Sequence, residues 1–113
     1  MNSNERLING RRQIYDLLIV FLRNCFQAHN ANLMDSRNEI LTLIEMCVAA
    51  LLELETDPEE IEYVIFSIGS RAFPRNFALI EWYANRIIGP RLVYEIISLE
   101  NSTDVTEMSD DEN

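Results

Sequence analysis

The chain has 113 residues and a formal net charge of −10, from 19 acidic and nine basic residues. A chain of this length forms one domain with a single core of modest size. Three glycines and three prolines are too few for the many tight turns of an all-β domain. The longest apolar run near the N-terminus has six residues, whereas a membrane span needs roughly 18. We therefore expect a helical protein without a membrane span, in the cytoplasm or the nucleus.

Two amphipathic helices are predicted in the first half of the chain. The first covers residues 9–28, because apolar residues recur there at helical spacing. The second is predicted to begin at Ser36, since Ser36 and Glu39 have the spacing of a capping box, in which each side chain accepts a backbone N–H. It extends to about residue 55. This second helix is apolar on most sides, which is typical of a central helix in a bundle.

The second half of the chain predicts three shorter helices. Asp57 and Pro58 suit the N-cap and the first position of the third helix, which Gly69 is predicted to end or kink. Gly89 and Pro90 separate a fourth helix from a fifth. The apolar face of the fourth helix consists of Phe77, Ile80, Tyr83, Ala84 and Ile87, with Trp82 to one side. The apolar residues of the fifth are Leu92, Val93, Ile96, Ile97 and Leu99.

These elements predict an all-α fold. We expect a compact bundle of about five helices over residues 1–100, followed by a disordered acidic tail over residues 101–113. In this tail Ser109 precedes three acidic residues and is a candidate phosphorylation site, where phosphate would add further negative charge.

The acidic charge is concentrated in two segments. Residues 35–62 hold nine acids and one arginine, and residues 100–113 hold six acids and no base. Six carboxylates surround the predicted junction of the second and third helices, and we call them the acidic corner: Glu53, Glu55, Asp57, Glu59, Glu60 and Glu62. They are interpreted either as a solvated turn whose acids cap helices, or as a docking surface for a basic partner segment. Their spacing does not match a calcium-binding loop.

All nine basic residues are arginine, and this absence of lysine has two interpretations. The first is chance drift in a short chain. The second rests on ubiquitin, which is ordinarily attached to lysine: arginine keeps the charge but does not take part in that chemistry. A regulator that works beside ubiquitin ligases would benefit from lacking the acceptor.

Some of the arginines lie near aromatic residues in the second half of the chain. Arginine beside exposed aromatic rings is suited to phosphate contacts and base stacking, whereas the negative charge of the whole chain repels nucleic acid. The residues of this predicted Arg/aromatic face are Arg71, Phe73, Arg75, Trp82, Arg86 and Arg91.

No motif of an enzyme is present. His29 is the single histidine, without a recognisable nucleophile nearby. Cys25 and Cys47 lie in apolar helical patterns and are expected to be buried hydrophobic residues. Because the chain has no Cys-x-x-Cys pair and no second histidine, we expect neither a metal site nor a cofactor.

The sequence therefore favours a small non-catalytic interaction module, a regulator or adaptor. It is expected to bind another protein, through a basic or amphipathic helix of that partner, by using an apolar helix face together with the acidic corner and tail. We also expect self-association, because a bundle of five short helices would leave part of the apolar surface of the second helix exposed. The alternative is a nucleic-acid-associated regulator that uses the Arg/aromatic face.

Overall fold

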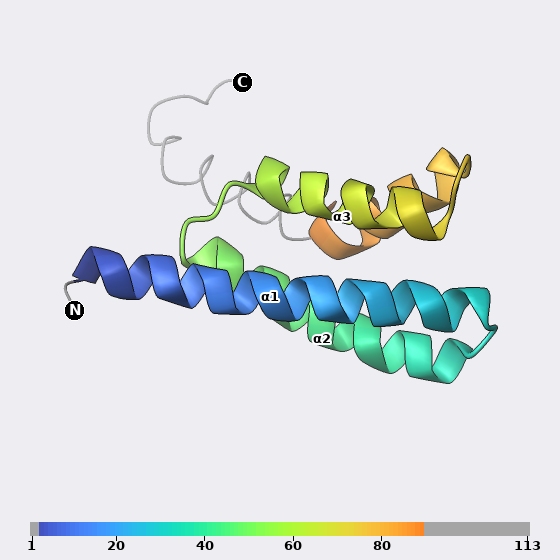
Figure 1. Cartoon of the computed structure of the whole chain (residues 1–113), viewed down its shortest axis with the longest axis horizontal. Helices are drawn as coiled ribbons and strands as arrows, with labels where there is room; N and C mark the ends of the chain where they lie inside the picture. Colours follow the sequence, from blue (N-terminus) through green and yellow to red (C-terminus); the bar gives the residue numbers. More distant parts are fainter. Residues whose placement is uncertain (1–2, 90–113) are drawn as a thin grey trace, which may run out of the picture.

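The computed structural model describes residues 3–89, and this part of the chain is helical apart from short connections. The elements are α1 (Ser3–Asn30), α2 (Met34–Glu53), α3 (Pro58–Ala72) and a fourth helix over residues 77–89. Helices α1 and α2 form an antiparallel pair, and α3 and the fourth helix lie along one side of it (Figure 1). The all-α prediction is confirmed. The described residues hold four helices instead of five, and the predicted fifth helix and acidic tail lie outside them.

Helix α1 is longer than predicted at both ends. It begins at Ser3 although residues 3–9 are exposed, so packing does not stabilise its first two turns. Glu5 in the first turn is placed favourably against the positive end of the helix dipole. At the other end His29, which the sequence places in a polar connection, belongs to the last turn of the helix. No helix of the described part combines the length and apolar character needed to cross a membrane.

The predicted capping box at the start of α2 is wrong. The helix begins at Met34 with Leu33 as its N-cap, and no side chain accepts a hydrogen bond there. Ser36 thus lies inside the first turn. The physical reason is the tight end of α1: the Leu33 N–H donates to the Ala28 carbonyl at 2.9 Å, so the chain has already reversed before Ser36.

A left-handed residue stands in each of the three connections between helices. These residues are Asn32 (φ 60°), Glu55 (φ 63°) and Arg75 (φ 66°). At the end of α2, the Glu55 N–H donates to the Leu52 carbonyl and the Thr56 N–H to the Leu51 carbonyl. This is the hydrogen-bond pattern of a Schellman motif, whose left-handed position is usually glycine. Glu55 takes that position here without being glycine.

The start of α3 agrees with the prediction and its end does not. The Asp57 carboxylate accepts the Glu59 N–H at 3.0 Å, and Pro58 is in the first turn. Gly69 does not end the helix, which continues to Ala72. A Cβ at Gly69 would lie 2.9 Å from Cγ2 of Ile80 in the fourth helix. The glycine is therefore explained by the close approach of these two helices.

The core lies where all four helices meet. Its fully buried side chains include those that the helical patterns place inward, such as Leu18, Ile44 and Ile61. Cys25 and Cys47 are buried free thiols, as predicted, and desolvation raises the pKa of Cys25 to about 11. In the fourth helix the predicted face is confirmed at four of its five positions. Phe77 is the exception, because it is 68% exposed.

Candidate functional site

Two of the six carboxylates of the acidic corner accept hydrogen bonds within the described part of the chain, and the other four do not. Asp57 caps α3, and Glu60 accepts a hydrogen bond from the Tyr15 hydroxyl at 3.3 Å. Desolvation, followed by the charge of Glu60, raises the pKa of Tyr15 to about 12. The other four acids are exposed, and within residues 3–89 none of them forms an ion pair. They are Glu53, Glu55, Glu59 and Glu62.

Three members of the acidic corner line a groove between the start of α3 and the end of the fourth helix. We call it the acidic groove, and its volume is about 380 Å³. Its α3 side consists of Asp57, Pro58, Glu59 and Glu62, and its other side of Ala84, Asn85, Ile88 and Gly89. The carboxylates on the α3 side are exposed, whereas Ala84 and Ile88 on the other side are buried against the core. The groove thus has an acidic rim on the α3 side, and on the other side an apolar wall of the nearly buried Ala84 and Ile88 next to the exposed Asn85.

The predicted Arg/aromatic face does not form one surface. Phe73 is buried in the core, where it packs against the rings of Phe26 and Tyr83, so it cannot stack on an external base. Arg86 forms an ion pair with Glu45 of α2. Arg75 is exposed in the last connection, and Arg91 lies outside the described residues.

Trp82 belongs to a partly buried cluster around Tyr83, which we call the tyrosine cluster and which sequence reasoning missed. The guanidinium of Arg37 in α2 donates to the Tyr83 hydroxyl at 3.1 Å and lies 5.8 Å from the Trp82 ring centroid. Nδ1 of His29 lies 2.7 Å from the same hydroxyl oxygen. Tyr83 is completely buried, and desolvation is the main reason why its pKa is raised. The three partners come from three different helices, and no local pattern in the sequence indicates their meeting.

We expect this cluster to make stability depend on pH through His29. Burial, and then the charge of Arg37, lower the pKa of His29 from its ordinary value of about 6.5. Below about pH 6.5 the unfolded chain therefore binds this proton more readily than the folded chain, and the free energy of unfolding falls until the folded pKa is passed. The measurement is urea unfolding between about pH 7.5 and about pH 5.

The control for this pH dependence is His29→Gln. The wild type and this variant share the same titrating carboxylates, so the difference between their unfolding free energies reports on His29. The difference in unfolding free energy between wild type and variant should shrink as the pH falls. A difference that stays constant over this range would show that His29 does not titrate differently in the folded chain.

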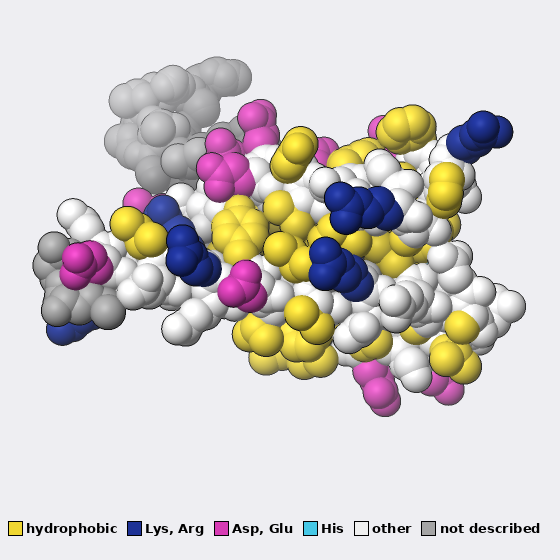
Figure 2. Space-filling view, viewed as in Figure 1, with side chains coloured by type: hydrophobic (Ala, Val, Ile, Leu, Met, Phe, Trp, Pro, Cys, Tyr) yellow, Lys and Arg dark blue, Asp and Glu magenta, His cyan; other side chains and the backbone are white. Residues whose placement is uncertain are grey.

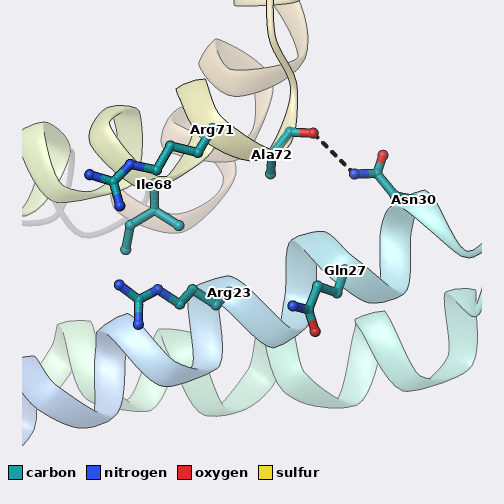
Figure 3. A pocket seen from close by; sticks show the side chains of 6 residues that line it. All are labelled: Arg23, Gln27, Asn30, Ile68, Arg71 and Ala72. Atoms are coloured by element: carbon teal, nitrogen blue, oxygen red, sulfur yellow. Dashed lines mark hydrogen bonds between the residues drawn. The ribbon is translucent and has the colours of Figure 1, made fainter.

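A second groove lies at the other end of α3, and we call it the arginine groove. Its volume is about 310 Å³, and its lining residues are Arg23, Gln27 and Asn30 of α1 and Ile68, Arg71 and Ala72 of α3. Figure 3 shows the two guanidinium groups on opposite walls but toward the same end of the groove, with Ile68 between them. Arg71 was predicted in a different surface. The helical pattern of α1 indicates only that Arg23 faces solvent, so the groove was missed.

The chain matches no protein-family model, no curated protein and no solved structure. Its function is therefore inferred from the chemistry of its own surfaces. Within residues 3–89 no three residues among histidine, cysteine, aspartate and glutamate come close enough to hold a metal ion. Two surfaces of defined chemical character within residues 3–89 are the acidic groove and the arginine groove.

Proposed function

We propose that the protein is a non-catalytic interaction module that binds a basic amphipathic helix of a partner protein in the acidic groove. The observation that supports this is the pairing of three carboxylates on one side of the groove with Ala84 and Ile88 on the other. A helix with arginine or lysine on one face and apolar residues on the next would place each face against its complement.

The charge distribution of the chain supports a basic partner. Glu59 and Glu62 have no cationic partner within residues 3–89, so their charges are available to a ligand. Exposed carboxylates of one sign also attract a basic segment from a distance and accelerate its association, an effect that salt weakens. The apolar wall then contributes contacts that salt does not weaken.

The test uses a synthetic amphipathic helix of about 15 residues, with arginine on one face and leucine on the other, labelled for fluorescence anisotropy. The double variant Glu59→Gln/Glu62→Gln removes two charges from the groove and keeps the side-chain size. We expect it to weaken binding of the peptide by about tenfold or more. Thermal unfolding of the same variant checks that the fold is retained.

A matched control removes the same net charge elsewhere. Glu39 of α2 and Glu81 of the fourth helix are exposed and do not line the groove, so Glu39→Gln/Glu81→Gln should change the affinity by less than about twofold. Equal weakening by both double variants would mean that the peptide senses only net charge, and the proposed groove would be rejected.

Self-association remains a prediction with some structural support. Leu17 and Val20 of α1 and Leu43 and Met46 of α2 are large apolar side chains that are 40–63% exposed. Figure 2 shows apolar side chains gathered along the edge of the α1–α2 pair that faces away from α3. The nucleic-acid alternative has less support, because Phe73 and Arg86 are engaged within the fold.

A further inference from the structure

We propose that the arginine groove is a binding site for a phosphate monoester, separate from the acidic groove. The two sites lie at opposite ends of α3, with Asp57–Glu62 at its start and Ile68–Ala72 at its end. They also have opposite charge. The proposal therefore does not depend on the function suggested for the acidic groove.

The first argument is that the described part of the chain provides no counter-charge. The side chains of Arg23 and Arg71 form neither an ion pair nor a hydrogen bond within residues 3–89, although the chain carries a net charge of −10. Arg71 is in the last turn of α3, where a cation is favourable next to the helix dipole. Arg23 lies about two turns before the end of α1, beyond the last turn in which the dipole acts, and lacks that explanation. Two like charges on one groove repel each other, and a bound anion that contacts both would relieve this repulsion.

The second argument is that a hydrogen bond joins the two helices that line the groove. The Asn30 side-chain amide donates to the Ala72 carbonyl at 3.0 Å, and this bond joins the end of α1 to the end of α3. It closes one end of the groove, as Figure 3 shows, while the two guanidinium groups lie toward the other end. The helices that present the two arginines are therefore held in register before any ligand binds.

The donor set fits a phosphate monoester. Each guanidinium offers a planar fork of N–H donors that matches two oxygens of a phosphate. A phosphate monoester carries a charge of about −1.5 to −2 at neutral pH, which balances two arginines. The amide of Gln27 adds a neutral donor, and Ile68 provides an apolar wall for the carbon side of the ester. A volume of about 310 Å³ is at the lower end of small-ligand pockets.

Two sources of such a phosphate are separated by the choice of probe. One is a free small molecule, represented by phosphoserine, and the other is a phosphorylated protein segment. For the second we use a peptide with the sequence of residues 104–113 phosphorylated at Ser109, because this chain contains that candidate site itself. Inorganic phosphate serves as the simplest probe. The unphosphorylated peptide is the control for the phosphopeptide. Binding to the full chain is followed by calorimetry and NMR chemical shifts.

We expect saturable binding of phosphoserine that falls by about tenfold or more in Arg23→Gln and in Arg71→Gln. Arg71→Lys keeps the charge but loses the fork, so its loss should be intermediate. Arg12→Gln is the matched control: Arg12 is exposed on α1 and outside the groove, and its replacement should change affinity by less than about twofold. These variants are at exposed positions, and thermal unfolding verifies that they fold.

Comparable affinity for phosphoserine and the phosphopeptide supports a small-molecule ligand. Phosphopeptide binding that is about tenfold tighter, with no binding of the unphosphorylated peptide, supports a protein segment. The proposal is overturned if neither inorganic phosphate nor phosphoserine binds, or if Arg12→Gln weakens binding as much as Arg71→Gln. Tighter binding of a single-stranded oligonucleotide, whose phosphates are diesters, would also overturn it.

Discussion

Replacing Tyr83 with alanine is expected to lower the free energy of unfolding by about 3–5 kcal/mol. The side chain is completely buried, and its ring contacts those of Phe26, Phe73 and Trp82. The variant would leave a cavity where the fourth helix packs on α1 and α2. It would also deprive the Arg37 guanidinium of one of its two hydrogen-bond acceptors within residues 3–89, since Asn38 is the other. A loss of this size is a large part of the roughly 5–15 kcal/mol that stabilises a typical domain.

Two neighbouring substitutions separate packing from hydrogen bonding at this position. Tyr83→Phe keeps the ring but removes the hydroxyl that meets Arg37 and His29, so we expect a smaller loss of about 1–3 kcal/mol. Trp82→Ala removes a larger ring from a side chain that is 47% exposed and should cost less than Tyr83→Ala. Urea unfolding of the three variants provides the comparison. Equal losses for Trp82→Ala and Tyr83→Ala would contradict the central place given to Tyr83.

Replacing Gly69 with alanine should destabilise the fold, although alanine is the better helix former. In an exposed helix this change would gain about 0.5–1 kcal/mol. Here the new Cβ would lie 2.9 Å from Cγ2 and 3.1 Å from Cγ1 of Ile80, a side chain that is almost fully buried. Overpacking of this kind costs about 1–3 kcal/mol, so we expect a net loss of about 1–2 kcal/mol. Thermal and urea unfolding measure it.

Gly10 offers the matched control for Gly69. It also lies inside a helix, but the nearest atom to its Cβ position would be Cδ1 of Leu54 at 3.9 Å, an ordinary contact. Gly10→Ala should therefore stabilise the chain, opposite in sign to Gly69→Ala. In an Ile80→Ala background the clash disappears, and Gly69→Ala should become neutral or favourable. If Gly69→Ala stabilised the wild-type chain, the close approach of α3 and the fourth helix would be refuted.

Much of the fold could be predicted because helical periodicity reports which side of a helix is buried. Ile80 and Tyr83 illustrate this, since their spacing alone places them inward. Helix ends were less predictable. Ser36 has the correct spacing for a capping box, but the reversal after Asn32 places α2 two residues earlier. Gly69 was misinterpreted because a glycine that permits close packing has the same local appearance as one that ends a helix.

The candidate sites were predictable only where they are continuous in the sequence. The acids of the corner lie within ten residues of one another, so composition alone located them. The arginine groove joins Arg23 to Arg71, and the tyrosine cluster joins His29 and Arg37 to Tyr83. Such sites depend on which helices pack together, and a single sequence does not contain that information in any local pattern.

The left-handed residues of the connections have a consequence for the order in which the chain folds. Asparagine tolerates this conformation, but Glu55 and Arg75 adopt it at a local cost of roughly 1–2 kcal/mol each. The isolated segments around these two residues therefore do not prefer the turns that they form. Packing of the helices must impose these turns. We therefore expect the chain to collapse around partly formed helices first and to form the turns at Glu55 and Arg75 late.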